Sequence, residues 1–480
     1  MVFSSIPFLF MFLPLTLGIY YALPRREKIQ NLFIFLASMF FYAWGEPRYI
    51  FVMLLSISVD YFAGLIMWKF DHSDKVRKGA LITSLVMNLA LLGLFKYGVF
   101  TIDNINLLFG TAFEYPHFQL GFDLPITHLP IGISFFTFQS LSYTIDLYKR
   151  NIKVQKQPIN FAAFVVLFPQ LVAGPIVRYS DIAKELDNRR VTLDMIYDGA
   201  LLFITGLGKK VLIANNIGLL WAQVRAMELA ELSILTAWLG IIAFTFQIYF
   251  DFSGYSDMAI GLGKMLGFHF PKNFDYPYMS KSISEFWRRW HITLGAWFKS
   301  YVYFPLGGSR RGLSRTVINL AIVWLLTGIW HGASWNFIVW GVFYGVIIIA
   351  EKLFLGRLLE KIPGVFRSIY TMLFVIIGWV IFDTANLSTA FGYIAAMFGF
   401  GGNSAIADST SSYLLLNYSV MLLICIFACT NLWRRIYTAL YKITPAVLNY
   451  CAVAYEAVVF IFVTAYLVNA GYNPFLYFNF

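Results

Sequence analysis

Two histidines in this chain directly follow a tryptophan and lie among aromatic residues, His291 and His331. Trp330 and Trp335 flank His331, and Gly332 leaves space beside its backbone. An imidazole titrates near neutral pH and can take a proton from a hydroxyl group as a general base. A polar side chain is costly in apolar surroundings unless it is paired or faces water. We therefore predict that His331 is a catalytic residue.

The segment around His291 has helical periodicity. Glu285 begins the sequence EFWRRWHITLGAWFKSY, and it forms an i,i+4 pair with Arg289 on the predicted helix. His291 is either a second catalytic residue or a hydrogen-bonded packing residue. The residues predicted to share its aromatic face are Trp287, Trp290, Leu294, Trp297, Phe298 and Tyr301.

A dense polar cluster begins at Asp251, directly after the apolar segment 232–250. Its Asp and Ser residues either cap the start of a helix or support an active site. The stretch 249–341 contains this cluster and both histidines. The predicted supporting residues of the polar core are Asp251, Ser253, Tyr255, Asp257, Asn273, Glu285, Trp290 and Trp330.

The composition excludes a soluble globular protein. Of 480 residues, 59% are hydrophobic and 13% are charged, and the mean hydropathy is +0.69. Such a chain has room for about a dozen membrane helices and no large soluble domain. We predict an all-α polytopic membrane protein, with re-entrant and amphipathic helices around a buried histidine. Residues 1–480 should form a single integral domain whose first helix is not cleaved.

The net charge of +11 is distributed in short basic clusters between apolar segments. Such clusters favour the cytoplasmic side of a bilayer and contact lipid headgroups, whereas nucleic-acid-binding proteins gather them on one face. We expect the cluster of Arg434, Arg435 and Lys442 to be cytoplasmic, and we expect no nucleic-acid partner. The three cysteines lack metal-ligand spacing, so we predict that no metal is bound.

Two apolar segments are interrupted. Pro169 and a Gly-Pro pair break residues 159–177, which predicts a re-entrant segment surrounded by protein. Lys209 and Lys210 interrupt residues 198–221, which form either one tilted span with snorkelling lysines or two short spans.

The central stretch divides into two predicted parts. Residues 251–315 are too polar for simple spans and too aromatic for a solvated loop, so we expect short amphipathic helices. Residues 316–330 and 334–351 are apolar, with basic residues at their outer ends, and should form a hairpin. The bend of this hairpin would place His331 deep in the membrane.

Several motifs together resemble the membrane-bound O-acyltransferase family, in particular its bacterial alginate O-acetyltransferase type. They are YFDFSGYSDMAIGLGKMLGF, SEFWRRWHITLGAWFKSYVYFPLGGSRRG, TGIWHGASWNFIVWG, PIGISFFTFQSLSYTID, FPQLVAGPIVRY and the terminal NPFLYFNF. The resemblance extends over nearly the whole chain. It implies that an acyl group crosses the membrane to an extracytoplasmic acceptor, that His331 is essential, and that His291 is the second polar residue of the core.

The expected acyl donor is cytoplasmic, either acetyl-CoA or an acyl carrier, and no cofactor is expected to be permanently bound. Its phosphate or carboxylate groups would contact Arg288, Arg289, Lys299, Arg310 and Arg311. The resemblance implies a multi-pass protein of the cell inner membrane that works with a periplasmic or other extracytoplasmic acetyltransferase partner.

Alternatives remain for the acceptor and for the class of protein. Alginate is the expected acceptor, and the alternatives are acetylation of peptidoglycan or cellulose and D-alanyl transfer to teichoic acid. A transporter would carry its unusual residues in two matching halves. This chain concentrates them in one stretch, which favours an enzyme.

Overall fold

The computed structural model describes residues 1–119, 123–401, 403–469 and 476. The regular elements of these described residues are helices and one pair of three-residue antiparallel strands. It divides into two compact units, Met1–Phe203 with Met258–Pro271, and Ile204–Asp257 with Lys272–Phe480. Most of the predicted polar stretch 249–341 belongs to the second unit. The single integral domain over residues 1–480 stays a prediction.

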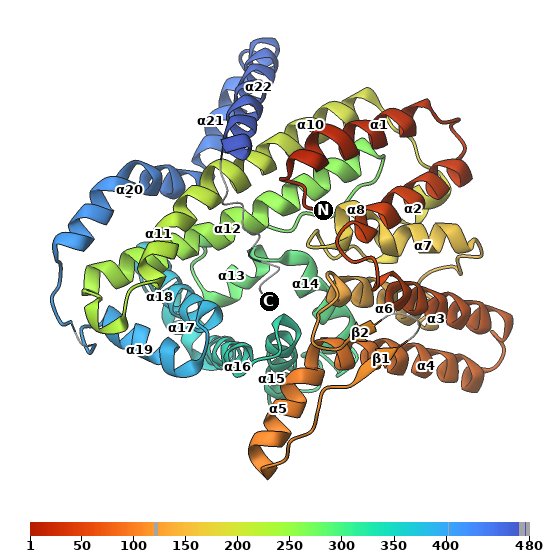
Figure 1. The fold of residues 1–480 in the computed structure, drawn as a ribbon, viewed down its shortest axis with the longest axis horizontal. Coiled ribbons are helices and arrows are strands. Elements are labelled where there is room, and N and C mark those ends of the chain that lie inside the picture. The colour runs from red at the N-terminus through yellow and green to blue at the C-terminus, as the bar shows by residue number, and fades with distance from the viewer. Residues whose placement is uncertain (120–122, 402, 470–475, 477–480) are drawn as a thin grey trace. The chain divides into compact units, whose positions relative to one another are not determined.

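The first unit consists of the N-terminal helices, the strand pair and four further helices (Figure 1). Its elements are η1 (Phe8–Phe12), α1 (Leu13–Ala22), α2 (Glu27–Ala43), α3 (Ile50–Lys69), α4 (Asp74–Leu92), η2 (Gly93–Tyr97), α5 (Gly98–Phe109), β1 (His117–Gln119), β2 (Asp123–Pro125), α6 (Ile133–Tyr148), α7 (Pro158–Val166), α8 (Phe168–Leu171) and α9 (Tyr179–Asp187). Two helices, α10 (Leu193–Gly208) and α12 (Ile234–Met265), contribute residues to both units.

A buried carboxylate joins three helices of the first unit. Asp60 on α3 accepts hydrogen bonds from Ser84 Oγ at 2.5 Å and Asn88 Nδ2 at 2.9 Å on α4, and from the hydroxyl of Ser140 on α6. All four side chains are buried. An unpaired polar group would cost several kcal/mol here, so these bonds hold α3, α4 and α6 in one register.

The predicted interruption in residues 159–177 is confirmed. The helix ends at Val166, resumes at Phe168 for one turn, and gives way to irregular backbone after Leu171. The side chains of this segment are almost all buried within the first unit. The broken backbone is therefore enclosed by protein, as its polar groups require.

The second unit contains the remaining elements. They are η3 (Lys209–Ala214), α11 (Asn215–Arg225), η4 (Leu229–Glu231), η5 (Pro277–Met279), α13 (Ile283–Arg289), α14 (Ile292–Phe298), η6 (Lys299–Tyr303), α15 (Leu313–His331), α16 (Trp335–Ala350), η7 (Glu351–Leu355), α17 (Gly356–Leu359), α18 (Gly364–Asp383), α19 (Leu387–Met397), α20 (Ser409–Ala428), α21 (Leu432–Tyr441) and α22 (Pro445–Asn469). The short helices α13 and α14 confirm the expectation for part of residues 251–315. The terminal NPFLYFNF motif lies outside the described residues apart from Leu476.

The two lysines in the segment 198–221 do not divide it. Helix α10 continues through the π-helical η3 into α11 without a break. Lys209 Nζ lies 2.6 Å from Asp257 Oδ2, and Lys210 Nζ lies 2.7 Å from Asp251 Oδ1 on α12. The segment is therefore one continuous helix, as the first alternative predicted, and the division into two short spans is wrong. The lysines do not snorkel, because ion pairs hold them inside the second unit.

The polar cluster 251–257 is not a helix entry. It lies in the interior of α12, a single helix of 32 residues, and not at its N-terminus. The capping interpretation is therefore wrong. Asp251 also accepts the backbone N–H of Leu476 at 2.9 Å, which ties the interior of α12 to the end of the chain.

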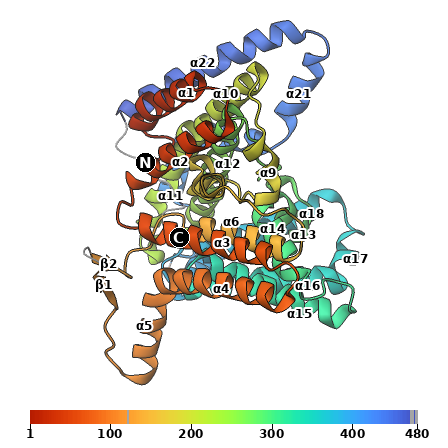
Figure 2. The same ribbon diagram turned by 90° about the vertical axis from the view of Figure 1, so that its right-hand side faces the viewer.

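The predicted hairpin around His331 is confirmed. Helices α15 and α16 lie side by side (Figure 2). Their contact depends on glycine, because a Cβ atom at Gly328 would lie 2.4 Å from the carbonyl oxygen of Phe337, and one at Gly341 would lie 2.5 Å from that of Trp324. Only glycine permits this separation of the two backbones.

Eight helices in the described part of the chain are long and apolar enough to cross a membrane, by length and composition. The prediction of about a dozen spans also counted shorter or more polar helices, such as α2 and α6. The polytopic all-α architecture is confirmed. The eight helical segments are Ile50–Lys69, Asp74–Phe109, Ile234–Met265, Leu313–His331, Trp335–Leu359, Gly364–Asp383, Ser409–Ala428 and Pro445–Asn469.

Replacing Gly328 should destabilise the hairpin. Gly328→Ala places a methyl group against the carbonyl oxygen of Phe337, and overpacking of this kind costs about 1–3 kcal/mol. Thermal unfolding in detergent should show a lower midpoint than wild type. Gly79→Ala on α4 is the matched control, because a Cβ there meets nothing within 4 Å. The better helix propensity of alanine should leave that midpoint equal or higher. Equal midpoints for Gly328→Ala and wild type would contradict the close contact.

Candidate active site

The predicted continuous helix from Glu285 is broken at His291. Helix α13 ends at Arg289, α14 begins at Ile292, and His291 has φ 45° and ψ 52°. The backbone of this segment bonds instead to another part of the chain. The N–H of Ile292 donates to the carbonyl of Asn273 at 2.9 Å, and the N–H of Asp275 donates to the carbonyl of Arg289 at 2.9 Å. These two bonds compete with the helical ones and turn the chain.

The orientation of the Asn273 side-chain amide shows which ring nitrogen of His291 carries the proton. The backbone N–H of Thr293 donates to Asn273 Oδ1 at 3.3 Å, and the Thr293 hydroxyl donates to it at 2.9 Å. That atom is therefore the amide oxygen, and it can only accept from His291 Nδ1, 3.1 Å away. Nδ1 is the protonated nitrogen, so Nε2 has a lone pair available. Nε2 has no hydrogen-bond partner among the described residues.

The surroundings of His291 keep it neutral. The ring is 2% exposed and packs edge-on against Phe252 of α12, with 4.8 Å between ring centroids. Burial lowers the pKa of His291 to about 3. A neutral imidazole with a free Nε2 can accept a proton or a hydrogen bond at physiological pH. Phe252 lies within the polar cluster 251–257, and its apolar side chain gives no sequence signal for chemistry.

His331 is half-buried at the end of α15, unlike the buried His291, and three aromatic rings pack against it. Its ring centroid lies 5.0 Å from that of Trp330, 4.9 Å from Trp340 and 5.4 Å from Phe382. The indole of Trp330 also contacts the ring of His291, at 6.1 Å between centroids. The same tryptophan therefore packs against both predicted catalytic histidines.

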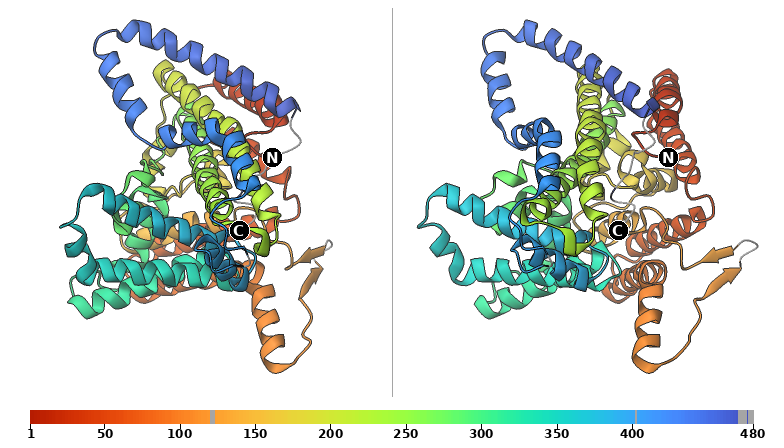
Figure 3. Two further views of the ribbon diagram at one scale, coloured as in Figure 1. Left: turned by 90° about the vertical axis from the view of Figure 1, so that its left-hand side faces the viewer. Right: turned by 60° about the vertical axis from the view of Figure 1, so that its left-hand side comes forward.

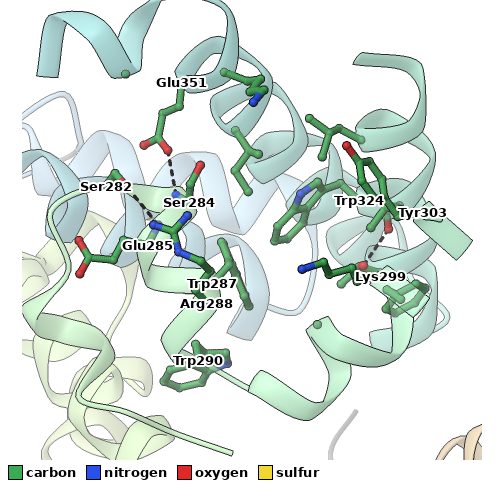
Figure 4. Close-up of a pocket in the computed structure, with 18 of the residues that line it drawn as sticks. Ser282, Ser284, Glu285, Trp287, Arg288, Trp290, Lys299, Tyr303, Trp324 and Glu351 are labelled. Atoms are coloured by element: carbon green, nitrogen blue, oxygen red, sulfur yellow. Dashed lines mark hydrogen bonds between the residues drawn. The ribbon is translucent and has the colours of Figure 1, made fainter. Parts of the chain in front are cut away.

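A cavity of about 930 Å³ opens beside His291 in the second unit. Figure 4 shows that α13 with its flanking residues Ser282 and Trp290, η6, α15 and η7 supply its labelled side chains. His291 lines the cavity, and His331 is not among its lining residues. The wall is aromatic, from Trp287, Trp290 and Trp324. The charged residues that line it are Lys281, Glu285, Arg288, Lys299, Glu351, Lys352, Glu360 and Arg367.

The predicted donor-binding residues separate into three groups. Arg288 and Lys299 line the cavity. Arg289 turns away and forms ion pairs with Glu285 at 2.8 Å and Asp275 at 3.9 Å. The i,i+4 pair predicted from the sequence is thus confirmed.

Arg310 and Arg311 are exposed and do not line the cavity, so their prediction as its residues is not supported. Three basic residues were missed, Lys281, Lys352 and Arg367. Lys352 and Arg367 stand in the sequence at the ends of apolar segments, whereas Lys281 lies in a polar stretch and gives no such signal.

The predicted supporting residues of the polar core lie in different parts of the second unit. Asn273 and Trp330 contact the histidines directly, whereas Glu285 lines the cavity. Trp290 is buried against Trp379, with 4.9 Å between ring centroids. Four residues lie on α12, where Asp251 and Asp257 pair with lysines and Ser253 and Tyr255 are buried.

Glu351 is a further residue that the sequence did not identify. Its carboxylate accepts the backbone N–H groups of Ile283 at 2.7 Å and Ser284 at 2.8 Å, and the hydroxyl of Tyr370 at 3.1 Å. The first two groups belong to the first turn of α13, which would otherwise lack partners. Glu351 therefore fixes the start of α13 at the cavity wall (Figure 4).

Comparison with known families is decisive for the class of protein. The model of MBOAT, the membrane-bound O-acyltransferase family, matches residues 39–394, which include both histidines and the cavity. The chain belongs to this family. This protein is therefore an enzyme that transfers acyl groups to hydroxyl oxygens. Its apolar helices place it in a bilayer as a multi-pass protein.

Proteins named for three different acceptors are similar to this O-acyltransferase. A probable alginate O-acetylase of Azotobacter vinelandii is 42% identical over 403 residues, 84% of this chain and 79% of the relative. A peptidoglycan O-acetyltransferase of Helicobacter pylori is 35% identical over 84% of this chain and 81% of the relative. A teichoic acid D-alanyltransferase of Streptococcus thermophilus is 28% identical over 47% of this chain and 58% of the relative.

Acidification should destabilise the folded O-acyltransferase through His291. An unfolded histidine has a pKa of about 6.5, so below that pH the unfolded chain takes up a proton that the folded chain excludes. The contribution of His291 to the free energy of unfolding is fully present above about pH 6.5 and is lost as the pH decreases toward 3. At pH 5 the free energy of unfolding should be lower by about 2 kcal/mol. The unfolding midpoint of His291→Gln, measured from pH 7.5 to 5, should fall less than that of wild type. His72→Gln, which changes an exposed histidine, should follow wild type. Parallel curves for His291→Gln and wild type would show that His291 is not buried in the neutral form.

Proposed function

We propose that this enzyme transfers an acetyl group from a cytoplasmic donor to hydroxyl groups of an extracytoplasmic polysaccharide, with alginate as the first candidate. One observation supports this choice of acceptor and acyl group. The alginate O-acetylase relative is 42% identical over 84% of this chain, whereas the D-alanyltransferase relative is 28% identical over 47%. Peptidoglycan is the second candidate, because its O-acetyltransferase relative covers an equal share of the chain at 35% identity.

The cavity beside His291 is the proposed donor site. Its basic side chains suit the phosphate groups of acetyl-CoA or of an acyl carrier's prosthetic group. The indoles of Trp287 and Trp324 offer apolar contacts to an extended thioester arm. The donor would then reach His291 from the side where Arg288 and Lys299 line the wall.

In the proposed reaction, the acceptor hydroxyl oxygen attacks the carbonyl carbon of the thioester. His331 takes the hydroxyl proton as a general base, the carbon–sulfur bond breaks, and the leaving thiolate receives the proton. This role is worth roughly two to four orders of magnitude in rate. His291, with Nδ1–H held by Asn273, presents the lone pair of Nε2 to the donor or the acceptor as a hydrogen-bond acceptor.

The enzyme is proposed to reside in the cell inner membrane and to work with an extracytoplasmic acetyltransferase partner. The described chain is built from membrane helices and short connections, and no soluble domain for gripping a polymer is present among these residues. His331 is half-buried and packs against three aromatic rings, which restrict the approach of a bulky polymer. A partner protein that receives the acetyl group or presents the acceptor would overcome this obstacle.

Removing the His331 imidazole should abolish acetyl transfer. His331→Ala is expected to lower the rate by about two to four orders of magnitude, because the general base is lost. The assay measures transfer of radiolabelled acetyl groups in membranes, with acetate uptake followed in parallel to test for a transporter. His72→Ala is the control. Transfer near the wild-type rate by a normally folded His331→Ala enzyme would refute the role. Labelling from a D-alanyl donor and not from an acetyl donor would refute acetyl specificity.

A reconstituted system tests the need for a partner. Purified enzyme is placed in liposomes that contain the acetyl donor, and polysaccharide is added outside. We expect little polymer acetylation until an extracytoplasmic acetyltransferase is added, because the described residues contain no domain that grips a polymer. Efficient acetylation by the enzyme alone would overturn the partner requirement and leave the acyltransferase assignment intact. Protein-free liposomes with the partner are the control for donor leakage.

A further inference from the structure

A second cavity in the second unit lies outside the proposed donor site. It has a volume of about 450 Å³ and lies between α21 and the segment that precedes α13. Its lining residues are Asp275, Tyr276, Arg289, Asn431, Arg434, Arg435, Thr438, Ala439 and Lys442. The six from Asn431 onward lie beyond residue 394, where the family match ends. Most of the cavity wall is thus built on a part of the chain outside the family match, and Asp275, Tyr276 and Arg289 complete it from inside the match.

The cavity has an excess of positive charge. Four basic side chains line it, and Asp275 is the one acidic residue among the described residues of its wall. Asp275 is already paired, with Lys272 Nζ at 2.5 Å and Arg289 at 3.9 Å. The hydrogen bond from Lys272, together with the charges of Arg289 and Arg434, holds the pKa of Asp275 below its usual value. Arg434, Arg435 and Lys442 therefore face a space whose single carboxylate is already neutralised.

Helix α21 is strongly amphipathic. Arg434, Thr438 and Lys442 are spaced four residues apart and share the face that lines the cavity. The opposite face is apolar and exposed, with Trp433 at 72% and Leu440 at 46% exposure. An exposed tryptophan beside basic residues is typical of a helix that lies at the boundary between lipid and water.

The neighbours of α21 place it at a membrane surface. Both α20 and α22 are long and apolar enough to span a bilayer, and α21 joins them through three residues on each side. Figure 3 shows the three blue helices following one another, with α21 as a separate rod between the other two. A connection this short between two spans lies close to the headgroups. The basic cluster indicates the cytoplasmic leaflet, which is rich in anionic lipids.

We propose that this cavity binds the phosphate group of an anionic phospholipid from the cytoplasmic leaflet. The guanidinium groups of Arg434 and Arg435 and the ammonium group of Lys442 would contact the phosphate oxygens. The exposed apolar face of α21 would lie among the acyl chains of the same leaflet. A phosphate group could also come from a soluble molecule, and the experiment separates these two sources. The proposal does not depend on the acyl group or the acceptor of the enzyme.

The test compares lipid binding to the full-length protein by native mass spectrometry. Delipidated protein in detergent is titrated with phosphatidylglycerol, phosphatidylcholine and glycerol 3-phosphate. We expect wild type to prefer phosphatidylglycerol to the other two. The variant Arg434→Gln/Arg435→Gln/Lys442→Gln should bind phosphatidylglycerol more weakly by roughly 100-fold, since each basic residue near an anionic lipid contributes about fivefold.

A matched variant removes the same charge elsewhere. Arg25→Gln/Arg26→Gln/Lys28→Gln changes three exposed basic residues that follow α1, and it should retain the wild-type affinity. Arg435→Gln alone should give an intermediate loss if the triple variant does not fold. Equal phosphatidylglycerol affinity for all variants would overturn the proposal. Glycerol 3-phosphate binding as tightly as phosphatidylglycerol would replace the lipid by a soluble phosphate ligand, and would also overturn it.

Discussion

The free energy of placing polar groups in apolar surroundings constrains this protein throughout. Asp60 is satisfied by hydroxyl and amide groups from two other helices, and Lys210 by Asp251 at 2.7 Å. Partners stabilise such groups, because an unpaired one costs several kcal/mol. The partners come from distant parts of the sequence, so the polar side chains determine the register of apolar helices whose surfaces alone would permit sliding. The active-site pair of Asn273 and His291 follows the same rule.

Much of the architecture could be predicted because its signals are local. The hairpin around His331 follows from two apolar segments with basic ends, and the break near Pro169 follows from the chemistry of proline. The break at His291 could not be predicted in the same way. Helical periodicity continues through that residue, and the bonds that compete with the helix come from Asn273 and Asp275, whose proximity depends on the tertiary fold.

The cavity residues show the same division. A sequence can indicate that Lys352 and Arg367 lie at the ends of membrane helices, but not that both line one cavity with Arg288. The sequence likewise shows charged residues in apolar surroundings, but not which of them form ion pairs. These residues are Lys209, Lys210, Asp251 and Asp257. On α13, the adjacent Arg288 and Arg289 line different cavities because successive residues of a helix point about 100° apart. This helix therefore forms part of the wall of two basic sites.

The backbone conformation at position 291 and the chemistry of the His291 side chain favour different residues. A φ of 45° is costly for a residue with a Cβ atom and free of cost for glycine. The imidazole, in turn, is the group that accepts protons or hydrogen bonds at the cavity wall. Selection for thermal stability alone would thus favour glycine at this position and remove the imidazole. The enzyme retains a locally strained residue at its active site, and the hydrogen bonds of Asn273 and the packing of Phe252 and Trp330 hold it there.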